Sequence, residues 1–143
     1  MKLDWVMLSN YAEAPPNSGL LYIMGGTWDT VNVQAPLEGA PPGVVAVLNG
    51  HLVFRLLFHS TEFGSDHELR ITIMDEDGSS AGEIKAGFRP QKQAGLPPSW
   101  DHGFNMVLPL TGLGVKKFGL YTINVQVDGQ HLSERPFRVL KGY

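Results

Sequence analysis

The amino-acid sequence predicts an all-β protein, an antiparallel β-sandwich of about eight strands formed by one domain that spans residues 1–143. Apolar residues recur at every second position in several short segments, which is the period of a strand with one buried face. The chain contains 17 glycines and 10 prolines, and many of them fall between these segments, where turns are needed. No segment outside residues 3–12 shows the spacing of an amphipathic helix.

The clearest strand pattern lies in residues 118–140. Apolar and polar residues alternate from Tyr121 to Val127, and Asp128-Gly129 then forms a two-residue turn that tolerates positive φ. We therefore expect an antiparallel hairpin whose first strand buries its apolar face. Burial of each of these side chains contributes about 1.5–3 kcal/mol before the loss of conformational entropy is counted.

The second strand of this hairpin is expected to contain a one-residue slip. The two-residue turn places Val125 opposite Leu132 and, further on, Tyr121 opposite Pro136. Leu132 and Phe137 then have opposite parity, so a continuous register would turn Phe137 to the solvent. Pro136 has no N–H group and suits a β-bulge. The sequence therefore predicts a bent last strand with its irregularity near Pro136.

The N-terminal part of the chain predicts two further strand regions. Residues 3–12 fit both a helix and a strand, and we favour a strand because the run is short and ends before Pro15-Pro16. Residues 20–33 predict two half-strands around Gly25-Gly26, a pair typical of a bulge or of a close backbone approach. Trp28 is the large side chain that such an approach would accommodate.

The middle of the chain, residues 44–59, predicts a central strand with apolar residues on both faces. Asn49-Gly50 interrupts it, either as a hairpin turn or as a bulge in one long strand. Residues 67–75 and 80–88 follow as two alternating strands joined by a turn. Residues 103–110 predict a short strand, and Pro109 places it at a sheet edge.

Composition limits the classes of function. The formal net charge is −3 and the longest basic run is Lys116-Lys117, so neither a nucleic acid nor a membrane is expected as a partner. The chain has no cysteine, which excludes thiolate catalysis and cysteine-ligated metals. We see no signal peptide and no apolar run long enough to span a bilayer, and we therefore expect a cytoplasmic protein.

Three groups of residues were weighed as sites of chemistry. Asp75-Glu76-Asp77 is the best candidate for a hard cation, but a turn between two strands explains the same residues better. His59 and His67 flank a short loop near Glu62, although exposed strand-end histidines are the commoner arrangement. No serine lies in a nucleophile-elbow motif. The sequence therefore predicts no catalytic residue, no metal and no cofactor.

Two resemblances accompany this interpretation. Tyr121 with Ile123 two residues later resembles the penultimate strand of immunoglobulin-like domains, with Ile123 in place of the core cysteine. This resemblance implies an immunoglobulin-like or related Greek-key topology, and a Tyr121 hydroxyl bonded to a nearby backbone group. The whole chain also resembles an uncharacterised bacterial family of small all-β proteins, through residues 21–29, 74–78, 119–121 and 135–139. That resemblance implies a cytoplasmic β-sandwich and supplies no activity.

The long segment 89–102 is the leading functional candidate. It lacks strand periodicity, and long loops of this kind are often binding elements. We predict an interaction loop for a protein partner or for a second copy of the chain, a homodimer, using Leu96, Trp100, Asp101 and His102. The competing interpretation is that Leu96 and Trp100 only cover the open end of the sandwich.

A second hypothesis is a module that binds a small ligand or a carbohydrate. Tyr22 and Trp28, together with Trp100, would form stacking platforms beside Asp29 or His102. An unrecognised enzyme is the third alternative, since the sequence contains no catalytic motif.

Overall fold

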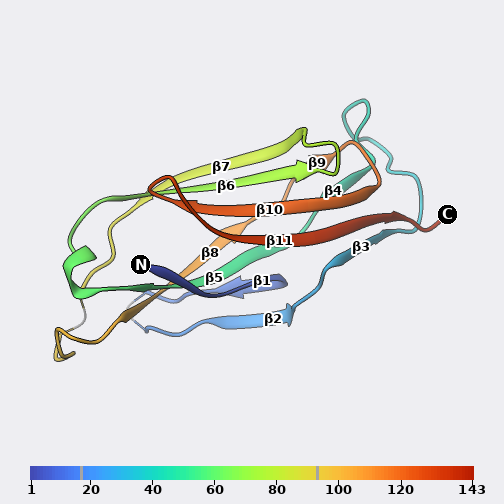
Figure 1. Ribbon diagram of the computed structural model, residues 1–143. Helices are drawn as coiled ribbons and strands as arrows, with labels where there is room; N and C mark the ends of the chain where they lie inside the picture. Colours follow the sequence, from blue (N-terminus) through green and yellow to red (C-terminus); the bar gives the residue numbers. More distant parts are fainter. Residues whose placement is uncertain (17, 93) are drawn as a thin grey trace.

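The computed structural model describes residues 1–16, 18–92 and 94–143, and it is all-β (Figure 1). One 3-10 turn, η1, interrupts the series of strands. In chain order the elements are β1 (Lys2–Glu13), β2 (Tyr22–Gly26), β3 (Thr30–Val33), β4 (Ala46–Leu48), β5 (His51–Phe58), η1 (Ser60–Glu62), β6 (His67–Asp75), β7 (Ser80–Phe88), β8 (His102–Pro109), β9 (Leu113–Val115), β10 (Gly119–Val127) and β11 (Gln130–Lys141).

The described strands form three sheets. A four-stranded sheet has the order β2-β1-β5-β8, a five-stranded sheet has the order β3-β11-β10-β6-β7, and β4 pairs with β9. The pairing of β3 with β11 is parallel, whereas every other pair in the described residues is antiparallel. The structure thus has more strands than the predicted eight, because short strands such as β9 were assigned to connections.

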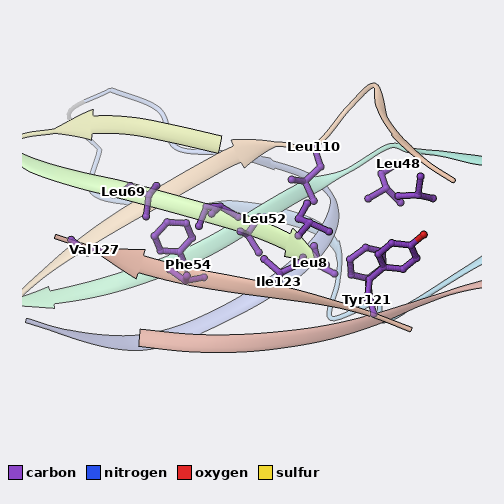
Figure 2. Packing of buried hydrophobic residues seen from close by; sticks show 14 of the residues in the cluster. Leu8, Leu48, Leu52, Phe54, Leu69, Leu110, Tyr121, Ile123 and Val127 are labelled. Carbon is purple, nitrogen blue, oxygen red and sulfur yellow. The ribbon is translucent and has the colours of Figure 1, made fainter. Parts of the chain in front are cut away.

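Both large sheets contribute one face to a common hydrophobic core (Figures 1 and 2). The alternation predicted for β6 and β10 is confirmed, since their apolar residues are buried and the residues between them are not. The four-stranded sheet supplies side chains such as Leu52, Phe54 and Phe58, all fully buried. Figure 2 shows Leu52 and Phe54 between the ribbons, close to Leu69 and Ile123 of the opposite sheet.

The Asn49-Gly50 pair separates β4 from β5 without reversing the chain. β5 pairs with β8 and β4 pairs with β9, so the hairpin alternative for Asn49-Gly50 is wrong. Leu48 lies opposite Leu113 and His51 lies opposite Pro109. Two unpaired residues, 49 and 50, therefore face three unpaired residues, 110 to 112. The pair therefore forms a bulge-like break, where the Leu110 N–H donates to the Gly50 carbonyl at 2.9 Å.

The C-terminal hairpin turns at Asp128-Gly129 as predicted, with φ of 52° and 79° at the two residues. Its slip is also present, but the predicted position near Pro136 is wrong. Val125 pairs with Ser133 and Gln126 pairs with His131, so Leu132 is the extra residue. Pro136 fits the regular ladder because β3 pairs with β11 only from Arg138 onward, and no N–H is required on that side.

The Tyr121 hydroxyl forms the predicted backbone bond. It donates to the Lys117 carbonyl at 2.6 Å and accepts the Lys117 N–H at 3.3 Å. Burial raises the pKa of Tyr121 despite the opposing hydrogen bond, so the hydroxyl keeps its proton for this bond. The connection before β10 is thereby fixed against the core.

Replacing Tyr121 with phenylalanine is expected to lower the free energy of unfolding by about 1–2 kcal/mol, because the Lys117 backbone groups lose their partner. Urea denaturation measures this loss. The exposed Tyr143→Phe variant is the matched control and should unfold as the wild type does. Equal stability of Tyr121→Phe and Tyr143→Phe would show that the hydroxyl bond contributes nothing.

In the described part of the chain, no helix has the length and apolar character needed to cross a membrane.

Candidate functional site

The predicted interaction loop divides into exposed and buried residues. Trp100 is 60% exposed, so it does not cover the core, and the covering role is wrong for this residue. Asp101 is exposed and Leu96 is half-buried. His102 is not a loop residue, because it begins β8, is 2% exposed and lies 4.7 Å from the Phe63 ring. Trp100 and Asp101 therefore remain as the exposed part of this candidate.

The predicted stacking residues do not form one platform. Tyr22 is 53% exposed at the start of β2. Trp28 is half-buried and packs edge-on against Phe137, with ring centroids 6.5 Å apart. Asp29 is exposed, accepts the Thr30 hydroxyl at 2.9 Å and follows Trp28 toward the other sheet. Because Trp28 packs against Phe137 of the core, only part of its ring is accessible to a ligand, in contrast to the predicted platform.

The acidic segment after β6 is a turn. One oxygen of Asp75, Oδ1, accepts the N–H groups of Asp77 and Ser79 at 3.0 and 2.9 Å. Hydrogen bonds from the Ser79 backbone, together with the Lys117 ammonium, hold the pKa of Asp75 below its usual value although partial burial opposes this. Within the described ranges, no three His, Asp or Glu side chains converge as metal ligands would.

His67 lies at the centre of a polar clasp, which we define as His67, Glu62 and Asp128. The ring is 9% exposed, so the expectation of an exposed strand-end histidine is wrong for His67. Its Nδ1 lies 2.7 Å from Asp128 Oδ2 and its Nε2 lies 2.9 Å from the Glu62 carbonyl oxygen. His59 is apart from this ring, because it is exposed and caps η1.

The clasp favours a doubly protonated His67. Carboxylate and carbonyl oxygens only accept, so both ring nitrogens must donate to satisfy both partners. Burial of the ring opposes protonation, but hydrogen bonds to Asp128 and to the Glu62 backbone, and the charges of both carboxylates, raise the pKa of His67 above its usual value. A ring held in this way is a structural cation, and it leaves no nitrogen to act as a base.

Three exposed apolar side chains lie close together on β1 and β2. Of these, the sequence indicates only Tyr22 as a candidate site residue. β1 pairs with β5 as far as Ser9 and with β2 from Ser9 to its end. Tyr11 lies opposite Met24, and Tyr22 lies two residues before Met24 on the same strand. Exposed fractions are 47% for Tyr11, 53% for Tyr22 and 67% for Met24. We call these three residues the β2 patch.

The strand β2 ends where glycine is required. Gly25 has a φ of 61°, and a Cβ at this position would overlap the Asn10 side chain. The close approach predicted for the glycine pair is therefore present, with Asn10 rather than Trp28 as the neighbour of Gly25. The pair ends the regular strand and leaves Tyr22, Ile23 and Met24 as an uncharged edge.

Sequence comparison supplies a family and no activity. A family model described as a family of unknown function (DUF6941) matches residues 4–140. No curated protein matches the sequence. Since the match covers nearly the whole chain, from before Trp5 to the end of the last strand, the chain belongs to the DUF6941 family of small all-β proteins.

Proposed function

We propose that this protein is non-catalytic and acts by association, with a second copy of the same chain bound through the β2 patch. The observation that carries this proposal is an uncharged edge strand with large exposed apolar side chains, Tyr22 and Met24, beside Tyr11. Exposed apolar patches on a folded surface mark interaction sites, and an open edge is a template for strand pairing.

Comparison with other sheet edges supports β2 as the contact. The edge strand β7 carries Glu83 and Lys85 on its exposed positions, which oppose pairing with another sheet. The edge strand β8 ends at Pro109, which lacks a donor for a further ladder. β2 has neither kind of protection. The edge strand β3 is also uncharged, but its exposed residues are the small polar Thr30 and Asn32, whereas β2 exposes Tyr22 and Met24.

A second copy is the occupant that fits this chemistry. A two-fold contact places each β2 patch against its own image, so Tyr22 and Met24 meet apolar groups. The exposed Glu13, which pairs with Tyr22 and accepts the Tyr11 hydroxyl at 3.1 Å, lies at the rim of this contact. Antiparallel alignment of two β2 strands joins two four-stranded sheets across the symmetry axis.

Replacing Met24 with lysine is expected to convert a dimer into a monomer, because two ammonium groups would face each other across the symmetry axis. Sedimentation equilibrium over a range of protein concentrations measures the change. Met24 is 67% exposed, so the variant should keep the wild-type circular dichroism spectrum.

Thr30→Lys is the matched control, since it adds the same charge to the exposed position of another edge strand, β3. It should dimerise as the wild type does. A wild type that remains monomeric at every concentration would refute the proposal. If Trp100→Ala dissociates the dimer and Met24→Lys does not, the contact is the predicted loop and not the β2 patch.

We also propose a fold class and a cellular location for the protein. The two facing sheets are consistent with a β-sandwich of the immunoglobulin-like class, supported by the bond between Tyr121 and the Lys117 backbone. The parallel pair β3–β11 departs from a purely antiparallel arrangement. A cytoplasmic setting accords with the absence of cysteine from the sequence.

A further inference from the structure

A cavity of about 390 Å³ lies on the four-stranded sheet, away from the β2 patch. It is bounded by Arg55 of β5, by the start of β8 from His102 to Asn105, and by parts of two connections. One connection, between β1 and β2, is tied to the sheet by a hydrogen bond of 3.3 Å from Asn105 Nδ2 to the Gly19 carbonyl. This volume is typical of sites for small molecules, which range from about 300 to 1,000 Å³.

Strand register places the Arg55 guanidinium at the wall of this cavity. Arg55 pairs with Asn105, so Gly103 is its diagonal neighbour on the adjacent strand. A Cβ at Gly103 would overlap Nε, Cζ and Nη2 of Arg55. The guanidinium therefore lies directly over the Gly103 backbone, in a space that only glycine leaves open. The absence of a side chain at this position is what directs the positive charge into the site.

Two guanidinium groups stand in the wall of this cavity. Arg55 and Arg89 both line it, and no acidic residue is among the described residues of its wall. Each arginine is also in an ion pair outside the wall: Arg55 Nε lies 3.7 Å from an oxygen of Asp4, and Arg89 donates from Nε to Asp66 at 2.8 Å. The Arg55 side chain is 43% exposed. Since a guanidinium has five N–H donors, both side chains keep terminal donors for a ligand.

Two polar atoms without partners lie on the Arg55 face of the sheet. Arg55 Nε and Asn105 Oδ1 are buried and have no hydrogen-bond partner among the described residues, and the two residues pair across β5 and β8. Buried polar groups of this kind mark places where a bound group or water completes the bonding. The side chains of His102 and Phe104 alternate to the opposite face, where they pack in the aromatic core, so Leu20 of the β1–β2 connection supplies apolar surface to the cavity. The site thus combines cationic donors with a place for a small hydrophobic body.

We propose that this cavity binds a small molecule that carries an oxyanion, a carboxylate or a phosphate, on a compact apolar body. The oxyanion accepts hydrogen bonds from the terminal nitrogens of Arg55 and Arg89, the geometry in which guanidinium groups bind such anions most strongly. The apolar body packs against Leu20 and the adjoining β1–β2 connection. Ligand binding in this cavity does not require contact through the β2 patch, so the proposal does not depend on whether the protein dimerises.

The test titrates the folded protein with benzoate and with phenyl phosphate, and follows the backbone amides of Gly19 and Gly103 by ¹H–¹⁵N NMR. At least one anion should shift both amides saturably, and neutral benzamide should bind at least about tenfold more weakly, since it lacks the charge that the guanidinium groups recognise. A preference for benzoate assigns the site to carboxylates, and a preference for phenyl phosphate assigns it to phosphates.

Two variants separate specific binding from general attraction of anions. Arg55→Gln and Gly103→Ala should each weaken binding about tenfold, the first by removing the charge and the second by displacing it. Arg138→Gln removes an exposed arginine of β11 and should leave the affinity unchanged. Where Gly103→Ala fails to fold, Arg55→Gln alone decides. The proposal is overturned if neither anion shifts the two amides saturably, or if Arg55→Gln binds as the wild type does.

Discussion

Replacing Phe58 with alanine is expected to lower the free energy of unfolding by about 3–5 kcal/mol. Phe58 is fully buried at the end of β5. Its ring centroid lies between 5.2 and 6.3 Å from four other rings, those of Phe63, His67, Phe88 and Phe104. Truncation removes apolar burial and leaves a cavity among side chains held by three different strands and by the residue that follows η1, so the site cannot close around the gap.

Urea denaturation, monitored by circular dichroism at the strand minimum, measures the loss for Phe58→Ala. Leu120→Ala is the control, because Leu120 is 42% exposed on β10 and truncation there should change the stability by about 0.5 kcal/mol or less. Comparable midpoints for the two variants would mean that the aromatic cluster around Phe58 is not a cooperative part of the core.

Replacing His67 with glutamine is expected to remove a pH-dependent part of the stability. Burial of the His67 ring lowers its pKa, but the hydrogen bonds to Asp128 and to the Glu62 backbone outweigh this effect. The pKa of His67 is therefore raised in the folded protein. Stabilisation by the protonated ring is fully present below the unfolded pKa, about 6.5, and is lost as the pH rises through the folded value. At pH 6 the variant should be less stable than the wild type by about 2 kcal/mol, because a buried charged hydrogen bond is lost.

Acid acts on the same clasp through Asp128. Burial works against ionisation, but the His67 ring and the Glu68 backbone lower the pKa of Asp128, so its contribution is lost as the pH falls through that lowered value. The His67 charge also acts weakly on two neighbouring carboxylates. The pKa of Asp66 is lowered chiefly by the Arg89 guanidinium, with a small further lowering from His67. Burial opposes ionisation of Glu62, but the N-terminal ammonium and the His59 backbone lower its pKa, again with a small addition from His67. The wild type should therefore be most stable between the ordinary pKa values of aspartate and histidine.

Thermal unfolding from pH 4 to 9 tests the His67 prediction. The stability of the wild type should fall toward pH 9 more steeply than that of His67→Gln, and the two curves should converge there. His131→Gln, which changes an exposed histidine of β11, should follow the wild type throughout. Parallel curves for His67→Gln and the wild type would show that His67 does not titrate with folding.

Much of the fold follows from local pattern. Alternation identifies β6 and β10 because each has one face in the core, and the pair Asp128-Gly129 identifies the turn by its dihedral preference. The pairing of β3 with β11 has no local signal, since it depends on segments far apart in the chain. The sequence predicts a slip in the last strand but places it near Pro136 instead of at Leu132. Only the pairing of β11 with both β10 and β3 shows that Pro136 needs no N–H donor.

Some features of the candidate sites likewise follow from the local sequence, whereas others depend on strand pairing between distant segments. Exposure of Trp100 accords with its position in a long loop rich in proline and glycine. Burial of His102 was missed because the strand β8 begins one residue earlier than the hydrophobic pattern suggests. The placement of Arg55 over Gly103 depends on a register between strands separated by the whole middle of the chain, so no spacing in the sequence reveals it.

The parallel pair β3–β11 has a consequence for synthesis on the ribosome. Thr30 to Val33 pair with Arg138 to Lys141, the Val33 carbonyl accepts the Gly142 N–H, and Trp28 packs against Phe137. A nascent chain therefore carries an uncovered strand edge, and an indole without its Phe137 partner, until residues 137–141 leave the exit tunnel. Truncation before residue 137 removes the cover of a strand that was synthesised more than one hundred residues earlier.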